Sequence, residues 1–369
     1  MDFDTAILKN EERIPFALRS LYARLGYVQY KMSKFEEYEL YLNNKDFLIS
    51  SDIISFTDTN GRLMALKPDV TLSIVRASRP GPGQVQKVYY DENVYRISKS
   101  SRSFREIRQV GLECIGAVDD YCVGEVLALA CESLRLISPE CRLNISHLGI
   151  VGAMLDNLGL RGETRKKAVK FIGEKNLHEL AALCRESGAQ EAALQKLEAL
   201  VRCSGAPESV LPALRALGCG AEAVGQLETL AALLEAAGVA ELVNIDFSVL
   251  SDMRYYSGIT FKGFVAGVPA AVISGGEYDK LLDRMGKKGR AIGFACYLDQ
   301  LERLADGEAP VDVDTVLLYD AGCDPLRVAA AVRAIQAEGR SVTAQKALPD
   351  KLRYQRALRL TESGVSELV

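Results

Sequence analysis

Apolar and polar residues alternate along residues 103–116, SFREIRQVGLECIG, with the period of two that is typical of a strand. The apolar face, which we expect to pack on a core helix, carries Val110, Leu112 and Cys114. The opposite face carries Gln109, Gly111, Glu113 and Ile115. Because Gly111 has no side chain, we expect room for a small ligand that offers donors or positive charge to Glu113, as an amino acid does. In the alternative interpretation, Gln109 and Glu113 simply face water.

Similar patterns predict the other elements. Apolar residues at helical spacing predict helices at 11–25, 71–77, 123–136, 291–304 and 326–338. Alternating or β-branched segments predict strands at 27–30, 47–57, 63–66, 85–96, 141–147, 242–249, 259–264, 269–274, 313–319 and 341–346. A hairpin is expected at 58–61, DTNG, and a turn at Gly275-Gly276.

The amino-acid composition of the chain changes between about residues 152 and 240. This segment is rich in Leu, Ala and Glu at helical spacing, so we interpret it as a helical insert. Strands on both sides of the insert are therefore expected to form one mostly antiparallel sheet. The predicted fold class is α+β, with a core domain at 1–310 and a small C-terminal α/β piece at 311–369.

Composition narrows the function. The 369 residues are 48% hydrophobic and 25% charged, as in ordinary globular proteins. The net charge of −4 and pI of about 5.6 argue against broad nucleic-acid binding. The nine cysteines have no zinc spacing, so we expect no metal and a reducing, cytoplasmic location. No signal peptide opens the chain, and no apolar run reaches membrane-spanning length.

Four stretches in a fixed order carry a resemblance to a known family. They are LKPDVTLSIVRA at 66–77, residues 94–116, SDMRYYSG at 251–258 and SGGEYDKLLDRMGKKGRAIGFACYLDQL at 274–301. Together they resemble the catalytic core of class II histidyl-tRNA synthetases, over most of residues 1–305 outside the insert. The resemblance implies an antiparallel sheet flanked by helices and a homodimer formed through the core. The C-terminal piece resembles a reduced anticodon-binding domain.

Several catalytic positions of that family are changed. Arg96 matches the motif-2 arginine and is a candidate anion contact, since guanidinium groups bind phosphate in a bidentate manner. Arginines of the family fall on Ser251 and Gln300, its motif-2 glutamate on Ser98, and its motif-1 proline on Ser33. We therefore expect no adenylating activity and no catalytic residue in this chain. Arg254 is either a solvated arginine or a contact for a ligand carboxylate.

The residues that contact the amino acid in the synthetases are mostly kept. The resemblance implies a histidine-binding set of Asp69, Thr71, Gln109, Glu113, Tyr255 and Tyr256. Asp69 replaces the usual glutamate, which keeps the charge but shortens the reach. Each residue also has a structural interpretation: Asp69 as a charge in the first turn of a helix, and the tyrosines as strand residues with apolar rings.

A synthetase core that keeps its amino-acid site and loses its nucleotide arginines is similar to the regulatory subunits of ATP phosphoribosyltransferase. That resemblance implies a non-catalytic subunit without a cofactor, which forms a hetero-octamer with a short-form catalytic subunit. It also implies that free histidine binds and causes feedback inhibition of histidine biosynthesis. Two alternatives stay open: an active histidyl-tRNA synthetase, and a synthetase-like protein with another binding role, such as nucleic-acid sensing.

Overall fold

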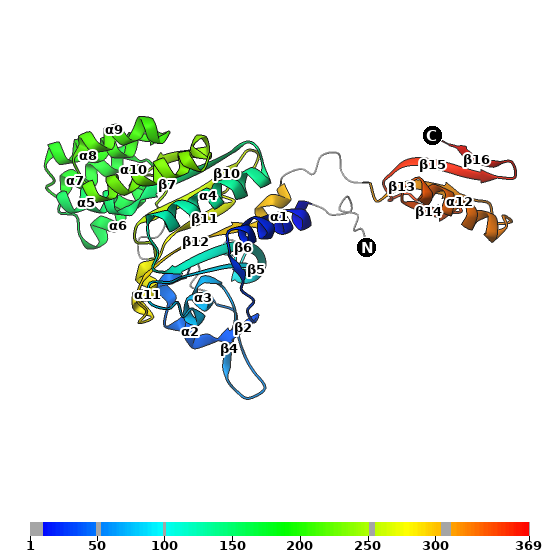
Figure 1. The fold of residues 1–369 in the computed structure, drawn as a ribbon, viewed down its shortest axis with the longest axis horizontal. Coiled ribbons are helices and arrows are strands. Elements are labelled where there is room, and N and C mark those ends of the chain that lie inside the picture. The colour runs from blue at the N-terminus through cyan, green and yellow to red at the C-terminus, as the bar shows by residue number, and fades with distance from the viewer. Residues whose placement is uncertain (1–9, 49–52, 99–100, 251–254, 304–310, 369) are drawn as a thin grey trace. The chain divides into compact units, whose positions relative to one another are not determined.

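A computed structural model of the chain describes residues 10–48, 53–98, 101–250, 255–303 and 311–368 (Figure 1). The chain divides into two compact units, residues 1–304 and 305–369. The sequence places this boundary at residue 310. Each unit is described by itself below.

The larger unit is built on a nine-stranded sheet with the order β1-β5-β6-β12-β11-β10-β7-β9-β8. The bounds of these strands are Val28–Gln29, Val85–Ile97, Phe104–Gly116, Arg290–Tyr297, Ile273–Glu277, Ile259–Val265, Cys141–His147, Val243–Asp246 and Ser204–Gly205. Only the β1–β5 and β7–β9 pairs are parallel. Because β7 precedes the insert and pairs with β10, which follows it, strands from both sides of the insert share one mostly antiparallel sheet, as predicted. The strands found within 47–57 and at 63–66 do not join it and pair in a separate small sheet.

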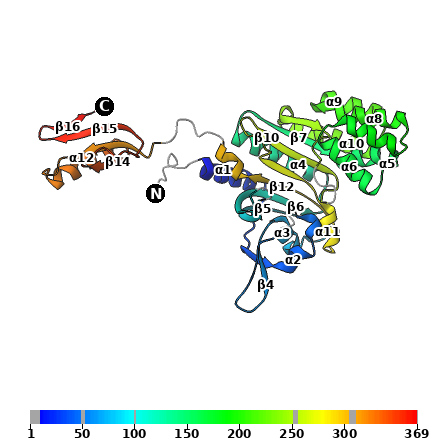
Figure 2. The same cartoon turned by 180° about the vertical axis from the view of Figure 1, so that it is seen from behind.

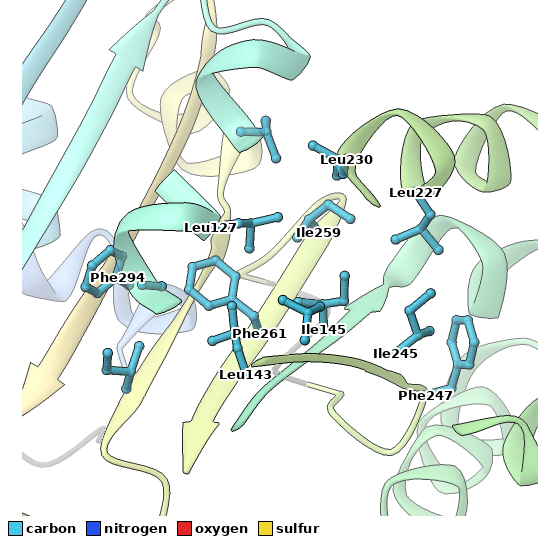
Figure 3. Packing of buried hydrophobic residues seen from close by; sticks show 14 of the residues in the cluster. Leu127, Leu143, Ile145, Leu227, Leu230, Ile245, Phe247, Ile259, Phe261 and Phe294 are labelled. Carbon is cyan, nitrogen blue, oxygen red and sulfur yellow. The ribbon is translucent and has the colours of Figure 1, made fainter. Parts of the chain in front are cut away.

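One face of this sheet forms the main hydrophobic core. Helices α1 (Asn10–Arg24) and α4 (Asp120–Ile137) pack on it, and α4 begins where the Asp119 side chain accepts from the Cys122 backbone N–H. Figure 3 shows Leu127 of α4 above Phe261 and Phe294 of the sheet. Val110, Leu112 and Cys114 are fully buried in this core, as their alternation predicts.

The insert is helical, as its composition predicts. Its helices are α5 to α10, with bounds Leu148–Asn157, Gly162–Gly173, Leu177–Glu186, Glu191–Arg202, Pro207–Leu217 and Ala221–Ala236. Helix α10 packs on α4, and Leu227 and Leu230 of α10 point into the shared core (Figure 3). The insert therefore extends the main core and is not a separate unit.

A second layer covers the opposite face of the sheet (Figure 2). It contains a three-stranded sheet in the order β2-β4-β3, whose bounds are Phe35–Glu37, Leu63–Leu66 and Ser55–Thr57. The helices α2, α3 and α11 complete it, at Tyr38–Leu42, Thr71–Ala77 and Asp279–Arg284. Apolar residues of α3 and α11, such as Leu72 and Leu281, pack against Val88 and Val94 of β5.

Two predictions near the end of this unit are wrong. Gly275 and Gly276 lie inside β11 and not in a turn, because their missing side chains admit close neighbours: a Cβ on Gly275 would lie 2.4 Å from the Gly293 carbonyl oxygen. The helix predicted at 291–304 is β12 followed by a 3₁₀ segment, Leu298–Arg303. Alanine and glycine on the polar face of β12 hid its strand alternation.

The C-terminal unit is a four-stranded sheet in the order β14-β13-β15-β16 with helix α12. The predicted β-α-β set is present as β13 (Val313–Leu318), α12 (Pro325–Ala337) and β14 (Val342–Gln345). Two further strands, β15 (Tyr354–Thr361) and β16 (Gly364–Glu367), were not predicted. Across both units, the described helices include none long and apolar enough to cross a membrane.

Candidate functional site

The second face of the large sheet carries buried polar side chains on neighbouring strands. Gln109 on β6 lies opposite Glu92 on β5 and Tyr297 on β12. Four residues along the same face, Glu113 lies opposite Val88 and Gly293. Gln109 is 3% exposed and Glu113 is 2% exposed, so the interpretation in which they face water is wrong.

Glu113 is the centre of this cluster. The Thr71 hydroxyl donates to Glu113 Oε1 over 2.7 Å, and the Tyr278 hydroxyl donates to Glu113 Oε2 over 2.5 Å. Burial raises the pKa of Glu113 to about 8, although both donors favour the ionised form and lower it. A buried carboxylate with free lone pairs is an acceptor for the N–H groups of a ligand.

Asp69 and Thr71 are brought to the cluster by the start of α3. Asp69 Oδ1 accepts from the Leu72 N–H over 2.9 Å, and Asp69 lies just before the N-cap residue Val70. Asp69 therefore does stabilise the start of the helix, as its structural interpretation says. It lies before the first turn, however, and not within it as expected. Burial raises the pKa of Asp69, and its hydrogen bonds and the neighbouring Arg96 oppose that shift.

Glycines on the sheet provide the space that the polar side chains occupy. A Cβ on Gly293 would lie 1.8 Å from Glu113 Oε2, and a Cβ on Gly276 would lie 2.5 Å from the Tyr256 ring. A Cβ on Gly111 would lie 2.5 Å from the Tyr90 hydroxyl. The space expected above Gly111 for a ligand is thus filled by Tyr90, because β5 pairs directly with β6 at this point.

The two predicted tyrosines lie in the same cluster. The ring centroid of Tyr255 is 4.6 Å from that of Tyr256 and 5.9 Å from that of Tyr278. Burial, with the neighbouring Asp69 and Glu113 carboxyls, raises the pKa of both Tyr255 and Tyr256, so both phenols stay neutral donors at neutral pH. The tyrosines and the two acidic residues therefore surround one polar region.

Gln109 has an unused donor. Its Nε2 atom is buried and has no hydrogen-bond partner among the described residues. A buried donor without a partner costs about 1–3 kcal/mol. An acceptor on a bound ligand would remove that cost, although other buried polar atoms, such as Ser146 Oγ, also have no partner among the described residues.

The positions that distinguish this chain from a synthetase are only partly visible. Arg96 Nε donates to the Pro68 carbonyl oxygen over 3.1 Å, which ties the strand to the loop before α3. Gln300 Nε2 donates to its neighbour Asp299 over 3.0 Å, and the Ser98 N–H donates to the Ser103 carbonyl oxygen within the β5–β6 turn. Ser251 and Arg254 lie outside the described residues.

Three tyrosines of the cluster were not predicted. Tyr278 lies in the stretch 274–301 that carries the family resemblance, directly after Gly-Gly-Glu, and that position was the available signal. Tyr297 lies in the same stretch, whereas Tyr90 is found only through the register, since it lies opposite Gly111 on the strand next to β6. Nothing in the local sequence separates Tyr90 from the other tyrosines of the chain.

This cluster combines several kinds of hydrogen-bonding group in one buried place. It offers carboxyl acceptors, phenol and hydroxyl donors and one free amide donor. In the part of the chain that the structure describes, no group of three or more His, Cys, Asp or Glu could hold a metal. His147 lies elsewhere, with Nε2 at 2.8 Å from Gln226 Oε1 of the insert.

Sequence comparisons point to two related groups. A family model described as Histidyl-tRNA synthetase matches residues 2–301. An ATP phosphoribosyltransferase regulatory subunit from Desulfitobacterium hafniense is 30% identical over 322 residues, which cover 85% of this chain and 81% of the relative.

Structure comparisons agree on the fold. A crystal structure from Bacillus halodurans, described as an ATP phosphoribosyltransferase regulatory subunit/histidyl-tRNA synthetase, has a TM-score of 0.74 at 24% identity and covers 95% of this chain and 93% of its own. A structure described as an ATP phosphoribosyl transferase (HisG:HisZ) complex from Thermotoga maritima has a TM-score of 0.63 at 21% identity, with 78% of this chain and 97% of that chain covered. The predicted synthetase-like fold is confirmed.

Proposed function

Because this chain belongs to the family of ATP phosphoribosyltransferase regulatory subunits, on a histidyl-tRNA synthetase fold, we propose that it binds free histidine and regulates a separate catalytic subunit. In this proposal the chain has no catalytic residue of its own. It assembles with a short-form catalytic subunit into a hetero-octamer, in which its core also pairs as a homodimer, and histidine bound at the Glu113 cluster inhibits the assembly.

The observation that carries this proposal is the pair of complementary groups on β6. Glu113, held by Thr71 and Tyr278, is an acceptor for an imidazole N–H. Gln109 Nε2, four residues along the same face, needs an acceptor. Free histidine carries donors on its ring and its ammonium group and acceptors on its carboxylate, so it can satisfy both groups at once. Asp69 adds a second negative group for the ammonium.

Feedback inhibition requires a difference in affinity between two states. A ligand shifts a conformational equilibrium only by binding one state more tightly than the other. In this proposal histidine binds the inhibited assembly more tightly than the active one. The chemistry then belongs to the partner subunit, and this chain supplies only the coupling.

Calorimetric titration with histidine tests the binding step. The wild-type chain should bind histidine saturably, and Glu113→Ala should lower the affinity about tenfold or more, because a ligand donor loses its carboxyl acceptor. Glu186→Ala, at an exposed position of α7, is the matched control and should bind like the wild type. Absence of binding by the wild type, or equal binding by Glu113→Ala, would rule out this site.

The rival function is that of an active histidyl-tRNA synthetase, which the family model over residues 2–301 and the retained Arg96 favour. Histidine-dependent exchange of pyrophosphate into ATP distinguishes a synthetase from the proposed regulatory subunit. We expect no exchange above a control without protein, because Ser251 and Gln300 stand where the resemblance expects arginines. Robust exchange by the purified chain would favour the synthetase.

A further inference from the structure

A separate groove lies at one end of the large sheet. It has a volume of about 710 Å³, within the range of small-molecule sites. Its walls are the loop 78–84, which leads from α3 to β5, and the loop 285–289, which leads from α11 to β12. Its floor is Gly116 and Ala117 at the end of β6. None of the site residues described above lines it.

The charge of this groove is opposite to that of the chain. Its lining contains Arg79, Lys287 and Lys288 and no Asp or Glu, although the chain as a whole has a net charge of −4. In the described part of the chain, none of these three cations forms an ion pair. Their positive charge is therefore not balanced by a protein carboxylate.

Two of the cations are held side by side by the same backbone oxygens. Arg79 Nη1 donates to the carbonyl oxygens of Arg76 and Ser78 over 2.6 and 2.7 Å. Lys287 Nζ donates to the same two oxygens over 3.0 and 2.6 Å. Burial, together with the charge of Arg79, lowers the pKa of Lys287. The fold thus fixes two like charges next to each other.

Capping of α3 accounts for only part of this arrangement. Lysine and arginine commonly donate to the last carbonyls of a helix. A helix C-terminus carries only about −0.5 of an elementary charge. Two full positive charges, with Lys288 as a third, leave a clear excess that an anion would neutralise.

We propose that this groove binds a small molecule carrying linked phosphate groups. Arg79 would supply the planar donors that suit phosphate, since its contacts with the Arg76 and Ser78 carbonyl oxygens use only Nη1. Lys288, which is exposed, would add charge from the facing wall. Both walls contain glycines, such as Gly83 and Gly286. A Cβ added at either position would have no atom within 4 Å, so the backbone there is accessible to the ligand. This site is independent of the histidine proposal.

Titration of the full chain with inorganic pyrophosphate tests the groove. The wild type should bind pyrophosphate saturably, more weakly at high salt, and Arg79→Ala and Lys288→Glu should each lower the affinity about tenfold or more. Lys288→Glu is the safer variant for folding, because Lys288 is exposed and caps nothing. Lys196→Glu, which makes the same charge change beside a smaller cavity of about 220 Å³, should bind like the wild type.

Two results would overturn the proposal. One is the absence of saturable binding by the folded wild type. The other is a loss of binding in Arg96→Ala with unchanged binding in Arg79→Ala and Lys288→Glu, which would place the anion at the remnant of the synthetase nucleotide site. Glu113→Ala should bind pyrophosphate normally, so failure of the histidine proposal leaves this test intact.

Discussion

At the scale of single residues, the proposed histidine site depends most on Glu113. This carboxyl group is buried on the sheet, and only two hydroxyl donors replace the water that it loses. Burial outweighs those donors, so its pKa rises from 4.5 in the unfolded chain to about 8 in the folded chain. Without a ligand, the folded chain therefore holds a proton that the unfolded chain releases at neutral pH.

Stability should consequently fall as pH rises. Between pH 4.5 and about 8 the folded state binds more protons than the unfolded state, so the free energy of unfolding decreases with pH across this window, by roughly a few kcal/mol. Urea unfolding at several pH values measures the slope. Glu113→Gln cannot titrate and should flatten it, while Glu186→Gln at an exposed position should not. Parallel profiles for wild type and Glu113→Gln would contradict the buried, protonated Glu113.

Local sequence explains some of these residues and not others. The alternation around Gln109 and Glu113 correctly placed both on one face of a strand. It could not show that the face is buried, because that depends on α3 and α11, which arrive from distant parts of the chain. Tyr90 joins the site only through strand register, which a single strand does not specify.

At the scale of elements, strands β11 and β12 show why glycine was misinterpreted, as a turn at Gly275-Gly276 and as part of a helix at Gly293. Gly293 faces Glu113, and the absence of a side chain on β12 makes room for the carboxylate. A sequence pattern treats glycine as a turn or a break. Here glycine marks close approach of a polar side chain to the backbone, which only the paired strand reveals.

Gly293→Ala should therefore disable the site. The added Cβ would lie 1.8 Å from Glu113 Oε2, so the carboxylate must leave its hydrogen bonds with Thr71 and Tyr278. It would also lie 2.4 Å from the Leu112 carbonyl oxygen, so β6 and β12 must shift locally. We expect histidine affinity to drop about tenfold or more, as measured by calorimetry, and the free energy of unfolding to fall as well, as measured by urea unfolding. Gly225→Ala, on α10 with no atom within 4 Å of the added Cβ, is the matched control. Normal histidine binding by Gly293→Ala would contradict the proposed place of Glu113.

At the scale of the whole molecule, composition and motif order were more informative than local pattern. The helical insert stood out by its Leu, Ala and Glu content, and it adds to the main core through α10 and α4. The β-α-β set of the C-terminal unit was visible, but β15 and β16 were not, because they follow the last predicted strand and join the sheet only through the pairing of β15 with β13. The proposed function rests on which synthetase residues were kept and which were replaced.

The most direct test of the central claim is a histidine inhibition curve for the assembled phosphoribosyltransferase. The chain is co-expressed with a short-form catalytic subunit, and the wild type is compared with Glu113→Ala, Thr71→Val and Tyr256→Phe. We predict that basal activity is retained and that the inhibition midpoint rises about tenfold or more for Glu113→Ala, because a weakened site loses differential affinity without touching the chemistry. Lost basal activity with an unchanged midpoint would contradict the account, since these residues would then hold the assembly together and not sense histidine.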